Sequence, residues 1–144
     1  MVSTAVFLAL FFTVVLLVTT GYFLMGGLPL LILKHDVPLD ARFIRSFFQV
    51  YYRAAFWASL GAGAGYGLWG RPAFAFGALA NAAAVTLLRR HMLRAMEHLG
   101  AQIAAQDARA IAEFRRLHAS ALLVNLLQVV LIVWGILQLS QQFR

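Results

Sequence analysis

Four long runs without a charged residue constrain the fold of this chain more than any other feature. They cover residues 1–33, 54–70, 72–88 and 119–143. A helix needs about 20 mostly apolar residues to cross a bilayer, with roughly 17–25 tolerated. Of the 144 residues, 62% are hydrophobic and 12% are charged, which is too apolar for the single core of a small soluble domain. The sequence therefore predicts one all-α domain, an integral membrane four-helix bundle.

The residues between the runs indicate where helices begin and end. The first run would reach about 50 Å as one helix, against a hydrocarbon core of about 30 Å. We therefore expect a kink at residues 26–29, where Pro29 removes a backbone hydrogen bond. Val37-Pro38-Leu39-Asp40 predicts a loop in which Asp40 is the N-cap of the next helix. Gly70-Arg71-Pro72 predicts a tight turn in which proline begins the third helix.

The polar stretch between Arg89 and His118 keeps a helical spacing of apolar residues. Gly100 is expected to end the third helix. We predict an amphipathic hairpin over about 95–117, in which the third and fourth helices extend beyond the membrane. The predicted spans are about 4–33, 47–69, 72–94 and 117–140.

Basic residues are distributed unevenly among the connections. Two of the 12 lysines and arginines, Arg71 and Arg144, lie outside the first and third connections. The positive-inside rule makes those two connections cytoplasmic and puts both termini on the other side, as in a bacterial inner-membrane protein. The net charge of +7 is then explained by orientation and by membrane lipids as partners, not by nucleic acid. The other ten basic residues are Lys34, Arg42, Arg45, Arg53, Arg89, Arg90, Arg94, Arg109, Arg115 and Arg116.

Small residues recur at four-residue spacing in the second and third spans. Such residues let membrane helices approach closely. We interpret them as the packing surface between spans two and three, with a homo-oligomer interface or a larger membrane complex as the alternative. The second span carries Gly61, Gly63, Gly65 and Gly67, and the third carries Ala73, Gly77, Ala80, Asn81 and Ala84.

Uncharged polar residues within the spans are costly in lipid and are expected to point inward. His118, Asn125 and Gln128 share one face of the fourth span, because offsets of seven and three return to the same side. We expect them to form a polar seam with Asn81 and with the entrance of span two, where Arg53 lies inside beside Asn125. Hydrogen bonding between helices is the favoured interpretation. A ligand site is the alternative, with candidates Gln49, Arg53, Asn81, His118, Asn125 and Gln128.

Three histidines, His35, His91 and His118, fall near the same ends of their helices. Imidazole is a good ligand for zinc, copper or haem iron. Arginines surround each candidate, and no His-Glu-x-x-His pairing is present, so we predict no cofactor and no metal site. Metal or haem binding by these three histidines is the alternative. The chain has no cysteine, which excludes thiolate ligands.

Two stretches resemble a known family. Phe47-Phe48-Gln49-Val50-Tyr51-Tyr52-Arg53, after the Val37-Pro38 turn, is similar to the second-helix entrance of the transmembrane-protein-205-like family. Residues 114–125, which read Phe-Arg-Arg-Leu-His-Ala-Ser-Ala-Leu-Leu-Val-Asn, resemble its fourth-helix opening. The related anthrone-oxygenase-like family, our second choice, has the same four-helix layout.

The resemblance implies a four-helix membrane fold and little chemistry. The first family has no defined activity, although a eukaryotic member is associated with drug export, and the second includes cofactor-independent oxygenases. Gln49 departs from the first family, which often has proline there. The resemblance adds Tyr52 and Arg116 to the ligand-binding candidates; the matching positions are Tyr51, Tyr52, Arg53, Arg116, His118, Ser120 and Asn125.

The leading hypothesis is therefore a non-enzymatic membrane protein that acts as a binding, transport-associated or complex-subunit protein. The alternative is a membrane-embedded enzyme, such as a cofactor-independent oxygenase, on a lipophilic substrate. In that enzyme His118 would be the base, and Asn125 or Arg53 would polarise a carbonyl. A closed pocket around His118, large enough for an aromatic substrate, would favour the enzyme over a packed seam.

Overall fold

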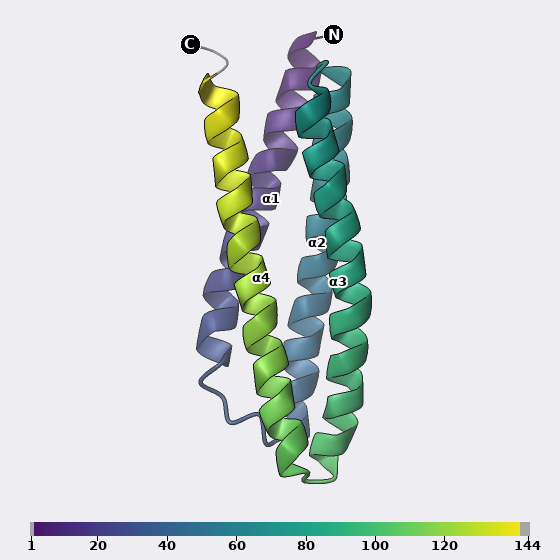
Figure 1. The fold of residues 1–144 in the computed structure, drawn as a ribbon, viewed down its shortest axis with the longest axis vertical. Helices are drawn as coiled ribbons and strands as arrows, with labels where there is room; N and C mark the ends of the chain where they lie inside the picture. Colours follow the sequence, from purple (N-terminus) through teal and green to yellow (C-terminus); the bar gives the residue numbers. More distant parts are fainter. Residues whose placement is uncertain (1, 142–144) are drawn as a thin grey trace.

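The computed structural model describes residues 2–141 and contains four long helices in an up-and-down arrangement (Figure 1). They are α1 (Val2–Leu30), α2 (Pro38–Leu68), α3 (Pro72–Ala104) and α4 (Ala108–Gln141). The loop after α1 and the turn between α3 and α4 lie at one end of the bundle, and the α2–α3 turn lies at the other. The prediction of an all-α four-helix bundle is confirmed.

Three of the helices, α1, α3 and α4, are long and apolar enough to cross a membrane, with mean hydropathies of 2.3, 1.3 and 2.3 in their most apolar windows. This is the pattern of an integral membrane protein. Helix α2 is not among them, because charged residues occupy its first half and glycine, serine and tyrosine its second. It buries twelve residues, against seven for α3, so protein covers much of its surface. A span over residues 47–69 stays a prediction.

Several helix boundaries differ from those expected. Pro38 is the first residue of α2 and Val37 its N-cap, so the prediction of an N-cap at Asp40 is wrong. A proline at this position loses no helical hydrogen bond, because the first N–H groups have no partner within the helix. Helix α1 continues through residues 26–29 and ends at Leu30, directly after Pro29.

Residues with a left-handed backbone conformation form the α2–α3 and α3–α4 turns. Gly70 has a φ of +77° between α2 and α3, a conformation that glycine adopts without steric cost. Helix α3 passes through Gly100 and ends at Ala104, so Gly100 is not a helix stop. Gln106, with a φ of +61°, makes the left-handed turn instead. The predicted hairpin over 95–117 is therefore two helix ends joined by residues 105–107.

Helix α2 packs closely between α1 and α3, whereas α4 packs more loosely against the same two helices. The larger core cluster includes Phe23, Phe48, Tyr51 and Phe114 and lies toward the end that carries the α1–α2 loop. A smaller cluster around Ala9, Ala62, Tyr66, Ala75 and Leu139 lies toward the other end. Because α4 packs loosely, space is left between α3 and α4.

The glycines of α2 divide between two neighbours. A Cβ on Gly65 would lie 2.5 Å from the backbone nitrogen of Ala9, and one on Gly61 would meet the ring of Phe12, both in α1. Gly63 faces Leu79 of α3, while Gly67 and Gly77 face open space. The interpretation of the row as one α2–α3 packing surface is therefore wrong for Gly61 and Gly65, because residues four apart lie on one face and the two interleaved pairs point differently.

Candidate functional site

A hydrogen-bonded chain of polar side chains crosses the bundle interior between α2, α3 and α4. Tyr51 donates its hydroxyl proton to Gln128 Oε1 at 2.8 Å. Gln128 Nε2 donates to Asn81 Oδ1 at 3.1 Å, and Asn81 Nδ2 donates to Ser59 Oγ at 2.9 Å. The polar seam, as the structure forms it, consists of Tyr51, Ser59, Asn81, Asn125 and Gln128. His118, which was expected in the seam, pairs with His35 instead. The prediction that amides of α3 and α4 meet inside the bundle is confirmed.

The direction of each bond in the seam follows from the donors available. Ser59 uses its only proton on the carbonyl of Ala55 at 2.7 Å, so its oxygen is free to accept from Asn81. Each primary amide carries two N–H donors and an acceptor oxygen. The bonds between described residues use one N–H of Asn81 and one of Gln128. Each amide therefore retains a second N–H.

Asn125 is the least satisfied member of the seam. It is 2% exposed, and its Oδ1 lies 3.5 Å from the Tyr51 hydroxyl. That hydroxyl has one proton, which the shorter bond to Gln128 takes. Among the described residues, Asn125 Nδ2 has no hydrogen-bond partner. The Asn125 amide is thus buried with few hydrogen bonds to replace those it would make to water, unlike the amide of Gln128.

Two histidines meet nearer the end of the bundle that holds the α1–α2 loop. His35 Nε2 lies 3.3 Å from His118 Nδ1, and neither residue is exposed. Phe48 and Phe114 pack against the pair, with ring centroids 5.5 Å from His118 and 5.7 Å from His35, respectively. His35 has a φ of +60°, so the loop takes a left-handed conformation there to bring its ring inward. The pair fastens the α1–α2 loop to α4.

Burial, the largest cause, lowers the pKa of His35 below its ordinary 6.5, and Arg115 lowers it further. The Leu33 carbonyl and the carboxylates of Asp40 and Asp36 act in the opposite direction on that pKa. Burial thus favours the neutral form of His35, and in the contact with His118 one ring nitrogen donates to the other.

Other candidates lie away from the seam. Arg53 is exposed, so the prediction that it lies inside beside Asn125 is wrong. It follows Tyr51 by two residues, about 200° around α2, and a long arginine side chain can reach the polar boundary from there. Arg116 is exposed, Gln49 is half-buried, and Tyr52 is buried among core residues.

The three candidate metal-binding histidines do not come together as a group. His35 and His118 are paired, but His91 is exposed on α3. Within residues 2–141, no group of three or more histidine or carboxylate side chains is placed to hold a metal ion.

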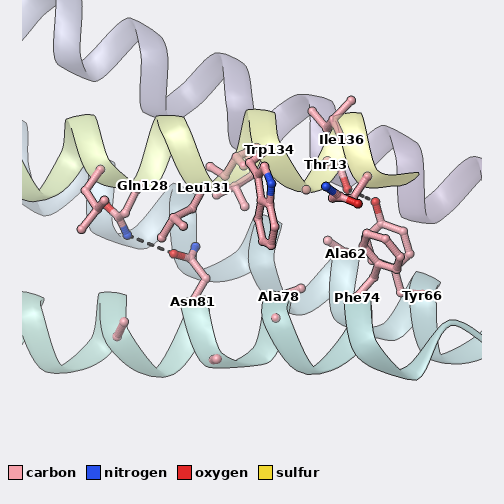
Figure 2. A pocket seen from close by; sticks show the side chains of 18 of the residues that line it. Thr13, Ala62, Tyr66, Phe74, Ala78, Asn81, Gln128, Leu131, Trp134 and Ile136 are labelled. Carbon is pink, nitrogen blue, oxygen red and sulfur yellow. Dashed lines mark hydrogen bonds between the residues drawn. The ribbon is translucent and has the colours of Figure 1, made fainter. Parts of the chain in front are cut away.

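A cleft of about 660 Å³ opens between α3 and α4, and residues of α1 and α2 form its floor (Figure 2). Its α3 wall is built from small residues, including Ala73, Gly77, Ala80 and Ala84. Leu131 and Trp134 of α4 form the facing wall. The small-residue row of α3 therefore lines open space toward α4 instead of closing onto α2.

Two hydrogen-bonded pairs of polar side chains line the cleft, in addition to the Gln138 amide and the Trp134 indole. In one pair, the amides of Asn81 and Gln128 are hydrogen-bonded to each other (Figure 2). In the other, the Tyr66 hydroxyl donates to Thr13 Oγ1 at 3.0 Å, since Thr13 donates its own proton to Ala9. In Figure 2 the Trp134 side chain lies between these two pairs. The cleft is thus a mostly apolar space with a few separated hydrogen-bonding groups.

Sequence reasoning missed four functional candidates: Thr13, Ser59, Tyr66 and Trp134. Little in the sequence indicates them, because an isolated hydroxyl or aromatic residue in an apolar helix can face lipid, the protein core or a cleft. Ser59 could have been found by spacing, since it lies eight residues after Tyr51 on one face of α2.

Comparison of the chain with protein-family models, curated proteins and solved structures found no match.

Proposed function

We propose that this membrane protein binds a lipophilic small molecule that enters from the bilayer between α3 and α4. The cleft of about 660 Å³ carries this proposal. Its volume is within the range of roughly 300–1,000 Å³ that is usual for small-molecule sites, and mostly apolar walls with a few polar groups are typical of them. An opening between two helices suits a ligand that partitions into lipid.

The polar seam gives the site a means to orient its ligand. Asn81 and Gln128 both line the cleft, and each retains an N–H donor beyond those used in the seam. A ligand with a carbonyl or ether oxygen would accept from these donors, while its apolar body lies along Leu131 and Trp134. The favoured ligand is therefore an apolar molecule with one hydrogen-bond acceptor, not a plain hydrocarbon chain.

The geometry favours binding over the alternative of an enzyme with His118 as its base. His118 is fully buried against His35 and Phe48 and is not among the residues that line the cleft. A general base must come within hydrogen-bond reach of the proton it removes. The resemblance to the transmembrane-protein-205-like family remains a proposal that rests on the residues quoted for it.

Photolabelling with an apolar aryl diazirine tests the proposal. In purified protein in detergent, labelling of cleft residues such as Ala78 and Leu131 should saturate with probe concentration. Gly77→Leu and Gly135→Leu would fill the cleft, because a Cβ at either position meets open space. Both should remove the saturable labelling. Gly67→Leu is the matched control, since Gly67 also faces open space but does not line the cleft. Labelling that never saturates, or that survives both substitutions, would refute the proposal.

We also propose that the end with the α1–α2 loop and the α3–α4 turn is cytoplasmic. Ten of the 12 basic residues flank these two connections, which supports that orientation. The chain has no cysteine, so single cysteines at Gln106 and Gly70 can be labelled in intact cells with an impermeant maleimide. Labelling of Gly70→Cys alone is expected, and labelling of Gln106→Cys alone would reverse the orientation.

A further inference from the structure

A second hollow, of about 510 Å³, lies beside the α1–α2 loop and the first turns of α4. Three basic residues line it together with four apolar ones: Lys34, Arg115 and Arg116, with Ala108, Ile111, Ala112 and Ala119. We call it the basic hollow. It shares no residue with the cleft between α3 and α4, so an inference from it is independent of the proposed function.

Among residues 2–141, none of the three cations of the basic hollow forms an ion pair with a carboxylate. Within residues 2–141 the one ion pair joins Arg45 to Glu97, with 2.8 Å between Nη2 and Oε2. Glu113 and Asp36 are close in sequence to Arg116 and Lys34 but form no ion pair with them. The side chains that line the hollow therefore carry a charge of +3 and have no direct carboxylate contact among the described residues. Three positive charges in one concave site attract an anion.

The hollow lies where the apolar segments meet the polar end of the bundle. Lys34 directly follows the apolar run of α1, and Ala119 begins the charge-free run of α4. A bilayer that covers those runs has its phosphate groups at this depth. Ile111, Ala112 and Ala119 supply apolar surface beside the cations. A ligand with an anionic head and an apolar tail matches this combination better than a free anion or a nucleic acid.

We propose that the basic hollow binds the phosphate group of an anionic phospholipid. Arg115 and Arg116 can each offer a planar fork of N–H donors to phosphate oxygens, and Lys34 adds a point charge. The acyl chains would run past Ala119 along the charge-free run of α4, and Ile111 and Ala112 would lie beside the head group. Bound lipid would join the loop after α1 to the start of α4, the same two elements that the His35–His118 contact joins.

Native mass spectrometry of the detergent-purified protein tests this proposal, with titration of dioleoyl phosphatidylglycerol against dioleoyl phosphatidylcholine. The wild type should prefer phosphatidylglycerol. In the triple variant Lys34→Gln, Arg115→Gln, Arg116→Gln that preference should fall by roughly 100-fold, since each of the three basic residues contributes separately to binding an anionic lipid. The control Arg90→Gln, Arg94→Gln, Arg109→Gln removes the same charge from exposed positions that do not line the hollow. It should keep most of the preference.

Three results would overturn the proposal. They are an equal loss in both triple variants, no preference in the wild type, and displacement of phosphatidylglycerol by millimolar inorganic phosphate, which would indicate a free-anion site. Should the triple variant fail to fold, a photoreactive phosphatidylglycerol analogue on the wild type decides the matter. Crosslinks within residues 108–119 support the lipid site, and crosslinks only elsewhere refute it.

Discussion

Replacing Gly65 with alanine tests the closest contact between α1 and α2. The added Cβ would lie 2.5 Å from the Ala9 nitrogen and 2.7 Å from its Cα. Carbon atoms in contact normally lie about 3.5–4.0 Å apart, so the two helices must separate by about 1 Å locally. Backbone cannot rotate away as a side chain can. Gly65→Ala should therefore be destabilising.

The size of the effect follows from two opposing terms. Overpacking of a well-packed contact costs about 1–3 kcal/mol. Alanine in place of glycine in a helix returns about 0.8–1 kcal/mol through helix propensity. Gly67→Ala gains the helix propensity of alanine without any overpacking, because its Cβ would meet nothing within 4 Å. The difference between the two variants isolates the contact and should be about 1–3 kcal/mol.

The assay is thermal unfolding of both variants and the wild type in the same detergent, followed by circular dichroism. At about 2–4 °C per kcal/mol for a chain near this length, the midpoint of Gly65→Ala should lie several degrees below that of Gly67→Ala. Gly63→Ala should fall between them, because its Cβ meets the Leu79 side chain at 3.0 Å and that side chain can move. Equal midpoints for Gly65→Ala and Gly67→Ala would refute the close α1–α2 contact.

Three further predictions concern the seam and the histidine pair. Gln128→Leu leaves the Asn81 oxygen unpaired and leaves the Tyr51 hydroxyl only its 3.5 Å contact with Asn125. It should lower the free energy of unfolding by roughly 1 kcal/mol, at about 0.6 kcal/mol per hydrogen bond in membrane proteins. The exposed Gln138→Leu is its control. Asn125→Leu should cost clearly less, because Asn125 makes one long contact at best, and an equal cost would contradict the seam geometry. The lowered pKa of His35 means that the unfolded chain binds its proton more readily, so stability should be full above pH 6.5 and fall as the pH drops below it. His35→Gln should flatten that part of the pH profile in the same unfolding assay, and an unchanged slope would refute the assignment.

Much of the fold could be predicted because the signals are local. Charge-free runs, Pro72 at a helix start and Gly70 in a turn each report on their own segment. Errors arose where two local signals competed. Asp40 is a good N-cap residue, but Pro38 could already begin the helix, and the chain takes the earlier start. Gly100 could end a helix, but Leu99 and Ile103 are buried on the same helix, so burial extends α3 past it.

The seam was predictable in part, because polarity inside an apolar run indicates an inward side chain whatever its partner. Asn81, Asn125 and Gln128 followed from this rule. The rule failed for Arg53, because a long charged side chain can extend along the helix to the polar boundary and place its charge there. A short amide side chain cannot reach that boundary. The pairing of His35 with His118 depends on a left-handed residue in a loop, and no periodicity in the sequence reports loop conformation.

The cleft shows why small residues alone do not specify contact. The row on α3 and the row on α2 look alike in sequence, yet Gly65 touches the backbone of α1 while Gly77 faces open space. Small side chains only permit two helices to approach closely. Whether they do so depends on the side chains of the facing helix. Helix α4 presents Leu131 and Trp134 to the small face of α3, and large side chains opposite small ones either interlock or hold the helices apart. Here α4 remains loosely packed, so the same composition that closes the α1–α2 interface leaves a cleft at the α3–α4 interface.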